Sequence, residues 1–238
     1  MNNFFYPAHH YALRDYLLEY NRLYAYPNTP TITDSHKIIL DSGAFHMHKA
    51  KKPINVKYAD KLLKHYEKYI AYKNVYCICA DTPKNPYKTK QLLDYMLKSN
   101  PLICPVIQNP CKRNQIDLYG IIKQIKLYKS MCSSRFIAMS NNSIDIFNNS
   151  NMNALKFIVN EAKKYFEHFH FFGAGYNYFD VLQWKKTGCD SIDSISYYTD
   201  AKHGLQWQQG SDKLASSGKK FIELSLENLK IANKKQEY

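Results

Sequence analysis

Six polar or small residues each come directly after an apolar run, namely Asp41, Asp81, Gln108, Ser140, Gly173 and Asp193. A carboxylate beside a buried strand is costly unless a partner or a reaction uses it. Asp193 is our candidate nucleophile. Asp190 lies an odd number of positions away, so on a strand its side chain faces the other way, and we interpret it as structural. Each residue taken singly also fits a turn or a helix cap, but together they predict carboxylate chemistry.

These residues need a scaffold that brings the ends of separate strands together. Short apolar runs alternate with helical patterns, which indicates parallel βα units. Seven runs recur about every 30 residues, the length of one unit, and we expect a weaker eighth strand at 220–224, whereas 13–30 reads as a helical pattern followed by turns. Eight units predict an α/β fold, a (β/α)₈ barrel, whose carboxyl-terminal rim collects catalytic groups. A doubly wound open sheet is the alternative fold.

The chain has 238 residues and a formal net charge of +13, with 33 Lys and Arg against 20 Asp and Glu. We find no linker or repeat that would divide it, so we expect one domain over 1–238 with a short basic tail from about residue 230. The positive charge favours a polyanionic partner such as nucleic acid. A generally lysine-rich composition is the other explanation.

Six scattered cysteines, several of them in apolar runs, indicate packing with reduced thiols. Cys77 and Cys79 form C-x-C, but no second ligand pair follows at the spacing of a zinc site, so we predict no metal and no cofactor. No secretory signal opens the chain and no run approaches the length of a membrane span. We therefore expect a cytoplasmic protein without membrane contact.

The polar residues at the strand ends suit a guanine-like base. The carboxylate of Asp81 can accept hydrogen bonds from the N–H groups of such a base. Its carbonyl oxygen can accept from the Gln108 amide or from a backbone N–H at Ser140 or Asn141.

Aromatic and small residues nearby would complete such a pocket. Phe45 and Phe172 can sandwich a flat ring. Gly43 and Gly173 would let the backbone approach the ring closely. The alternatives are that both glycines serve ordinary turns and that Phe172 belongs to the core.

Five segments in this order resemble the tRNA-guanine transglycosylases and the related phage and bacterial enzymes that insert 7-deazaguanines into DNA. They are L-D-S-G-A-F at 40–45, A-D-T-P at 80–83, V-I-Q at 106–108, F-F-G-A-G at 171–175 and G-C-D-S-I-D-S at 188–194. Each segment alone is weak, whereas five in order on alternating βα units, over about residues 4–204, are fairly specific.

The resemblance implies a (β/α)₈ barrel that exchanges guanine in a polynucleotide for a 7-deazaguanine. Asp193 would attack C1′ of the sugar and form a covalent glycosyl-enzyme, and Asp41 would be the general acid and base. The catalytic pair is then Asp193 and Asp41. The implied substrate-binding set is Ser42, Phe45, Asp81, Gln108, Ser140, Asn141, Phe172 and Gly173.

The sequence departs from the family at several points. The usual zinc site, C-x-C-x₂-C with a distant His, has no counterpart after Gly204, where the chain has no Cys. Ser140-Asn141 stands where many members have Gly-Gly, which puts the incoming base in doubt. No additional RNA-binding domain follows. We therefore favour DNA over tRNA as the acceptor.

Basic residues beyond two of the strand ends are candidate phosphate contacts. They are Lys49, Lys51, Lys52, Lys202 and His203. A solvated charged face is the other interpretation. Whether the chain forms a homodimer stays open.

Three further functional interpretations remain beside DNA base exchange. The first is a transglycosylase acting on tRNA. The second is a barrel glycosidase or lyase acting on free nucleosides. The third is a catalytically inactive barrel that binds nucleic acid or a partner.

Overall fold

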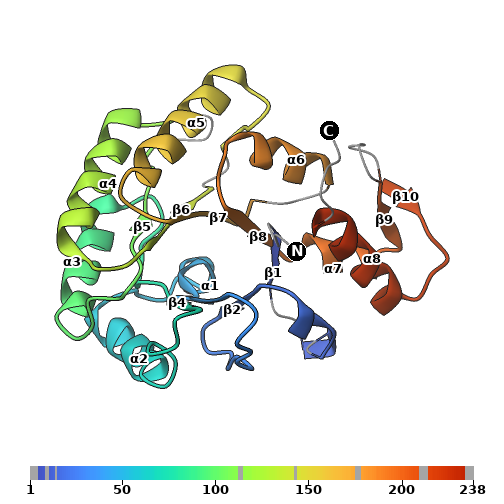
Figure 1. Cartoon of the computed structure of the whole chain (residues 1–238), viewed down its shortest axis with the longest axis horizontal. Coiled ribbons are helices and arrows are strands. Elements are labelled where there is room, and N and C mark those ends of the chain that lie inside the picture. Colours follow the sequence, from blue (N-terminus) through green and yellow to red (C-terminus); the bar gives the residue numbers. More distant parts are fainter. Residues whose placement is uncertain are drawn as a thin grey trace.

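Eight short parallel strands surround the centre of the described chain (Figure 1). The structure, a computed structural model, describes residues 5–8, 11–13, 15–111, 115–141, 144–174, 178–208 and 214–233. The strands are β1 (Phe5–Pro7), β2 (Arg22–Ala25), β3 (Ile38–Asp41), β4 (Val75–Cys77), β5 (Val106–Ile107), β6 (Phe136–Ser140), β7 (His168–Phe172) and β8 (Ser191–Ser194).

The strands close into a ring in sequence order. Hydrogen bonds join them into two parallel sheets, β2-β3-β4 and β1-β8-β7-β6-β5. Two isolated parallel bridges, Ala8 with Leu23 and Ile78 with Cys104, connect the sheets at both seams. The expected (β/α)₈ barrel is therefore confirmed, and the open-sheet alternative is wrong.

All the helices but the first cover the outside of the barrel, and the first lies near the middle of the view in Figure 1. The helices are α1 (Ala44–Lys49), α2 (Val56–Tyr66), α3 (Pro86–Leu97), α4 (Leu118–Met131), α5 (Asn149–Lys163), α6 (Tyr178–Lys186), α7 (Ser196–Lys202) and α8 (Phe221–Asn233). Side-chain oxygens of Asn55, Asn85, Asp117 and Asn148 accept backbone N–H bonds and so begin α2 to α5. No helix in the described ranges is long and apolar enough to cross a membrane.

The barrel is irregular near its first and last strands. In the described residues between β1 and β2, the helices are two short 3₁₀ helices, η1 (Tyr11–Leu13) and η2 (Tyr16–Glu19), and no helix connects β2 to β3. After α7, the antiparallel strands β9 (Leu205–Trp207) and β10 (Leu214–Ser216) form an appended ribbon beside α8, at the right of Figure 1.

The interior of the barrel contains rings as well as aliphatic side chains. Along β7 the side chains alternate, so Phe171 packs outward on Trp184 of α6, with ring centroids 4.6 Å apart. His168 on the opposite face stacks on Phe136, at 5.0 Å between centroids. The inward face of β7 therefore carries His168, His170 and Phe172 toward the barrel axis.

The position of one strand differs from the sequence expectation. The segment expected to be the eighth strand, 220–224, begins α8, because buried Leu224, Asn228 and Leu229 recur at helical spacing. The missing strand is β2, R-L-Y-A, in a passage that we interpreted as helix and turns. The basic tail expected from about 230 belongs to α8 as far as Asn233, and Phe4 and 234–238 lie outside the described residues.

Candidate active site

Asp41 is the last residue of β3 and is held by the turn that follows it. The Gly43 N–H donates to Asp41 Oδ2 at 3.1 Å. Gly43 has a φ of 69°, and a Cβ there would lie 2.9 Å from the carbonyl oxygen of Tyr26. Both the backbone conformation and the close approach therefore require glycine at this position.

Asp41 lies within electrostatic reach of two other carboxylates. Burial, followed by the negative charges of Asp81 and Asp193, raises the pKa of Asp41 to about 7. Backbone hydrogen bonds from Gly43 and Ser42 act in the opposite direction. The expectation that the ends of β3 and β8 bring their acids to one rim agrees with this geometry, and Asp41 can carry a proton near neutral pH.

Asp81 lies in the loop after β4 and is 8% exposed. Ser42 Oγ donates to its Oδ1 at 2.8 Å, and Gln108 Nε2 donates to its Oδ2 at 2.8 Å. Burial raises the pKa of Asp81 to about 6, although both hydrogen bonds lower it. The carboxylate is therefore rigidly oriented, and each oxygen keeps acceptor capacity for a further donor.

Gln108 is fully buried, with both ends of its amide engaged. Its Nε2 bonds Asp81, and its Oε1 accepts from the Lys84 N–H at 3.0 Å. Gln124 of α4 holds the Gln108 backbone, accepting from its N–H at 3.0 Å and donating to its carbonyl at 2.9 Å. The structure thus places Gln108 behind Asp81 as its support, whereas we expected its amide at the edge of the base.

Asp193 is on β8, and only 8% of it is exposed. His170 Nε2 of β7 and the Gly173 N–H both lie 3.0 Å from Asp193 Oδ1. Among the described residues, these two hydrogen bonds to the carboxylate share the same oxygen. Within that part of the chain, Oδ2 accepts no hydrogen bond.

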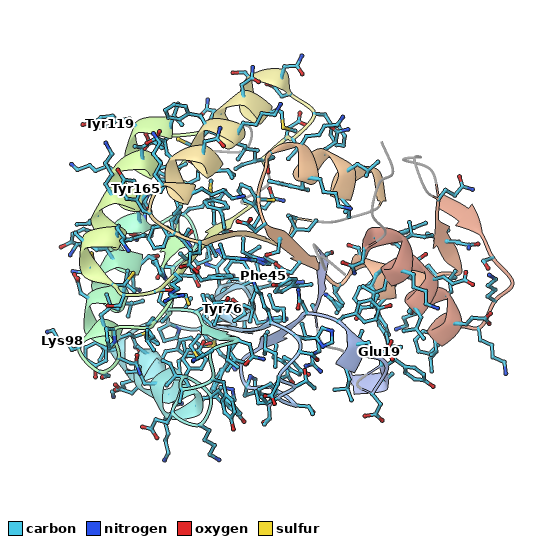
Figure 2. All side chains as sticks on the ribbon, viewed as in Figure 1. Glu19, Phe45, Tyr76, Lys98, Tyr119 and Tyr165 are labelled. Atoms are coloured by element: carbon cyan, nitrogen blue, oxygen red, sulfur yellow. The ribbon has the colours of Figure 1, made fainter. Side chains whose placement is uncertain are left out.

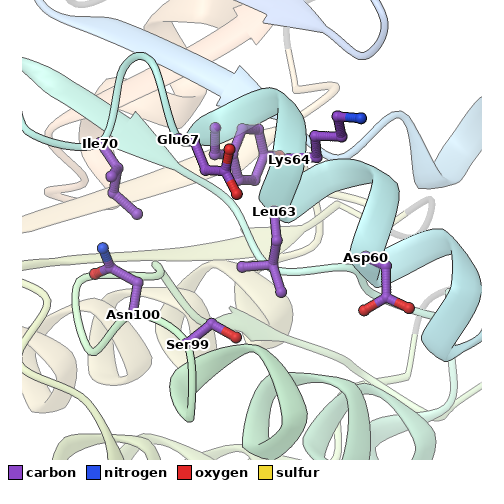
Figure 3. Close-up of a pocket in the computed structure, with 8 residues that line it drawn as sticks. Asp60, Leu63, Lys64, Glu67, Ile70, Ser99 and Asn100 are labelled. Carbon is purple, nitrogen blue, oxygen red and sulfur yellow. The ribbon is translucent and has the colours of Figure 1, made fainter.

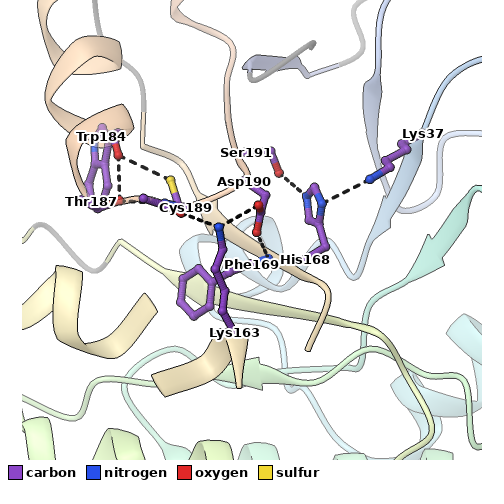
Figure 4. Close-up of polar contacts among 10 residues, drawn as sticks. Lys37, Lys163, His168, Phe169, Trp184, Thr187, Cys189, Asp190 and Ser191 are labelled. Carbon is purple, nitrogen blue, oxygen red and sulfur yellow. Dashed lines mark hydrogen bonds and ion pairs between the residues drawn. The ribbon is translucent and has the colours of Figure 1, made fainter. Parts of the chain in front are cut away.

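Asp190 has a different role from Asp193 (Figure 4). Its Oδ2 accepts from the Phe169 N–H at 2.8 Å, and its Oδ1 pairs with Lys163 Nζ of α5 at 2.8 Å. These contacts connect β8 with β7 and α5, so the structural interpretation of Asp190 is confirmed.

Asn141 and Ser140 close the end of β6. The Asn141 N–H donates to the Phe172 carbonyl at 3.2 Å, and Asn141 Nδ2 donates to the Gly173 carbonyl at 3.2 Å. The backbone donor expected to read a base at Asn141 is therefore used between β6 and β7, and that part of the expectation is wrong. Ser140 is partly exposed at the strand end.

The three remaining residues of the expected pocket lie at the same rim. Phe172 is partly exposed, and its ring meets His170 edge to face at 4.8 Å. Phe45 on α1 is 67% exposed and lies near the middle of the view in Figure 2. Gly173 has a φ of 62° and open space where a Cβ would be. A flat ring can thus approach Phe45 and the Gly173 backbone from solvent.

The five candidate phosphate contacts are exposed but form two separate groups. Lys49, Lys51 and Lys52 end α1 and begin the loop to α2. Lys202 and His203 are at the opposite end of α7 from β8. The three lysines after α1 therefore form one group, and Lys202 and His203 at the end of α7 form another.

Sequence reasoning missed His170 and Ser191, which lie directly behind Asp193. The alternation H-F-H-F-F at 168–172 was the available signal, because it puts both histidines on one face of a strand. Within the described residues, no group of three or more His, Cys, Asp or Glu is arranged to hold a metal ion.

A depression of about 400 Å³ lies elsewhere, between α2 and the loop after α3 (Figure 3). Its lining combines Asp60, Lys64 and Glu67 with Leu63, Ile70 and Asn100. None of the three carboxylates of the rim contributes to it, so it is not part of the candidate site.

Comparisons with known proteins give a fold and no family. No protein-family model and no curated protein matches the sequence. The solved structure of QR15, an aldolase, is similar with a TM-score of 0.51 and 11% identity, over 82% of this chain and 90% of the aldolase. At this identity the likeness concerns the fold alone. The comparisons thus show the (β/α)₈ architecture of the chain.

Proposed function

We propose that the protein exchanges guanine in a polynucleotide, with DNA as the favoured acceptor, for a 7-deazaguanine derivative through a covalent aspartyl-glycosyl intermediate. The observation that carries the proposal is the contrast between Asp41 and Asp193 at one rim. Asp41 has a pKa raised to about 7, whereas two donors hold one oxygen of Asp193. Two carboxyl groups in different environments suit an acid and a nucleophile.

In the first half-reaction Asp193 Oδ2 attacks C1′ of the sugar. The bond from C1′ to the base breaks, its electron pair goes to the base, and protonated Asp41 gives that base a proton. The transition state is cationic at the sugar, so a nearby carboxylate stabilises it. The product is a glycosyl ester of Asp193 and a free guanine.

In the second half-reaction the incoming 7-deazaguanine attacks C1′ from the side that guanine left. Asp41, now ionised, takes the proton from the attacking nitrogen, and Asp193 leaves with the electron pair of the ester bond. Two inversions at C1′ preserve the configuration of the nucleoside. Asp41 thus returns to its protonated state, and each turnover begins and ends with the same enzyme.

The base itself would be held by Asp81 and by aromatic stacking. Asp81 accepts N–H donors from the base edge, and the bonds from Ser42 and Gln108 fix the direction in which its lone pairs point. Phe45 and Phe172 stack on the ring faces. Stacking on an aromatic side chain is worth about 1–3 kcal/mol per base.

The aldolase neighbour does not supply a better-supported reaction. An aldolase that works through a Schiff base needs a lysine amine beside its carbonyl substrate. Strands β1 to β8 carry no lysine in the bounds given above. The carboxylates of the rim therefore favour glycosyl chemistry over Schiff-base chemistry.

The test is base exchange in the purified protein. We would incubate it with single-stranded DNA, duplex DNA or tRNA and with candidate 7-deazaguanines, then digest each polymer and identify the nucleosides by mass spectrometry. We expect a deazaguanine nucleoside in DNA and none with Asp193→Asn. Exchange confined to tRNA would change the acceptor. Absence of exchange in all three polymers, or full exchange by folded Asp193→Asn, would reject the proposed function.

A further inference from the structure

A line of polar side chains runs through the barrel interior behind Asp193. It begins at exposed Lys37, just before β3, whose Nζ lies 3.4 Å from His168 Nδ1. His168 Nε2 is 2.7 Å from Ser191 Oγ, and Ser191 Oγ is 2.7 Å from His170 Nδ1. His170 Nε2 then reaches Asp193 Oδ1 at 3.0 Å. Figure 4 shows the first part of this line, from Lys37 through His168 to Ser191.

The two ends of the line fix the direction of the hydrogen bonds that Lys37 and Asp193 themselves make. A lysine ammonium can only donate, and an ionised carboxylate can only accept. His168 Nδ1 must therefore accept from Lys37, which puts the His168 proton on Nε2. At the other end Nε2 of His170 must carry a proton to donate to Asp193.

Ser191 is the link between the two imidazoles. Its hydroxyl accepts from His168 Nε2–H. A neutral His170 with its proton on Nε2 would accept the Ser191 proton at Nδ1.

The protonation of His168 agrees with this direction. Burial, followed by the positive charge of Lys37, lowers the pKa of His168 to about 2. A neutral imidazole has one donor and one acceptor nitrogen, as the line requires. His168 is 7% exposed and His170 is fully buried, so water has little access to compete.

We propose that His168, Ser191 and His170 form a one-way donor relay that holds Asp193 as an oriented carboxylate, with Oδ1 anchored and Oδ2 presented to the substrate. These are positioning residues, since none of them reaches the reacting atoms. Aligned hydrogen bonds polarise one another, so Lys37 at the far end of the barrel contributes to the field at the nucleophile. The catalytic meaning of the relay rests on the proposed function of Asp193, whereas its direction does not.

The direction is tested without any substrate. Long-range ¹H–¹⁵N spectra of protein labelled with ¹⁵N-histidine distinguish the two neutral tautomers and the imidazolium. His168→Gln and His170→Gln assign the two signals by their loss. We expect both rings to be neutral with the proton on Nε2, and we expect Ser191→Ala to shift both signals. An imidazolium at His170, or a proton on Nδ1 of either ring, would overturn the proposal.

The positioning role is tested by separating kcat from KM in the exchange assay. His170→Phe keeps a ring but removes the donor, so we expect kcat to fall about 100-fold with KM within about twofold. His170→Gln restores an N–H donor and should recover about tenfold of that loss. Ser191→Ala should lower kcat about tenfold.

Ser225→Ala is the matched control, because Ser225 is also fully buried but bonds the Phe221 carbonyl in α8. It should leave kcat unchanged while lowering stability as much as Ser191→Ala does. Equal kcat for Ser191→Ala and Ser225→Ala would overturn the positioning role. If wild-type protein exchanges no base, the proposed function fails, and the tautomers still decide whether the relay exists.

Discussion

Aspartate side chains on the two sides of the barrel rim have different surroundings. On the β3 and β4 side, Asp41 and Asp81 lie close enough to repel each other, and burial and that repulsion raise the pKa of Asp41 to about 7. On the β8 side, Asp193 is backed by a fully buried histidine and by a backbone N–H. Burial and a neighbouring acid thus raise the pKa on one side, whereas two hydrogen-bond partners hold the carboxyl group on the other.

The surroundings of Asp41 and Asp193 differ because different groups hydrogen-bond to the two carboxyl groups. Asp41 is held by the backbone of its own turn, within two residues, so its surroundings add few donors. Asp193 is held by a neighbouring strand whose inward side chains are histidines. The division of labour that we propose for the two aspartates therefore rests on the residues around them, since the two side chains are chemically identical.

The largest expected effect comes from removing the proposed nucleophile, Asp193, while keeping its structural neighbour, Asp190. Asp193→Asn should lower exchange by about 10³-fold or more, since the covalent step has no substitute. It should also form no covalent adduct with DNA on a denaturing gel when the incoming base is withheld.

Asp190→Asn is the matched comparison on the same strand. It weakens a partly exposed ion pair with Lys163 and one backbone hydrogen bond, which together are worth about 1–2 kcal/mol. We expect a lower melting temperature with exchange within about threefold of wild type. Equal loss of exchange in the two variants would contradict different roles for the two acids.

Asp41→Asn should be the next largest change, lowering kcat by about 10²–10⁴-fold because the proposed general acid and base is lost. In the proposed mechanism, transfer of a proton to the leaving base needs protonated Asp41. The rate of guanine release should therefore decline as the pH rises above about 7. A rate of guanine release that does not change between pH 6 and pH 8.5 would assign the proton transfer to another group.

The same variant should be more stable than wild type at high pH. The pKa of Asp41 is raised from 3.8 to about 7 in the folded protein, so between these values the folded state keeps a proton that the unfolded chain loses. Stability therefore falls as the pH rises through this window. Asp41→Asn removes this pH-dependent loss of stability. The melting temperature of the variant should therefore exceed that of wild type at pH 8, by about 2–4 °C per kcal/mol of stability gained, and match it at pH 4.

Ser42→Ala tests the orientation of Asp81 and should have a moderate effect. The Ser42 hydroxyl lowers the pKa of Asp81, so its loss raises that pKa above its present value of about 6. A protonated Asp81 accepts base N–H groups less well. We expect KM for the incoming base to rise about tenfold at pH 7 and to recover at pH 8.5, with kcat little changed. A KM that stays high at both pH values would mean that Ser42 contacts the base itself.

Much of the site was predictable because strand ends are readable in sequence. Asp41, Asp81 and Asp193 each follow an apolar run, and a parallel barrel brings such ends to one rim. The roles of Gln108 and Asn141 were not readable, because a sequence does not say that an amide will bond a neighbouring carboxylate or that a strand-end N–H will be used by the next strand.

The two errors in the fold have physical causes. β2 is only four residues long and includes Arg22, which is fully buried and bonds Thr33 Oγ1 at 2.6 Å. A buried arginine removes the apolar signal on which strand recognition depends. The segment at 220–224 is rich in apolar residues that fit either element over five positions, and its helical spacing becomes clear only when Leu229 and Ala232 are included.

The smallest expected effect concerns the path of the nucleic acid along the protein. It compares the lysines on the β3 side of the rim with Lys202 on the β8 side. Each phosphate neutralised by a lysine contributes about 0.9 to the slope of log affinity against log salt for duplex DNA. If the strand passes the β3 side, replacing Lys49, Lys51 and Lys52 by Gln should reduce that slope by about 2–3, while Lys202→Gln leaves it unchanged. Filter binding between 50 and 200 mM salt measures both. A smaller slope for Lys202→Gln alone would place the nucleic acid strand beside α7. Equal slopes in all variants would mean that these lysines form a solvated face.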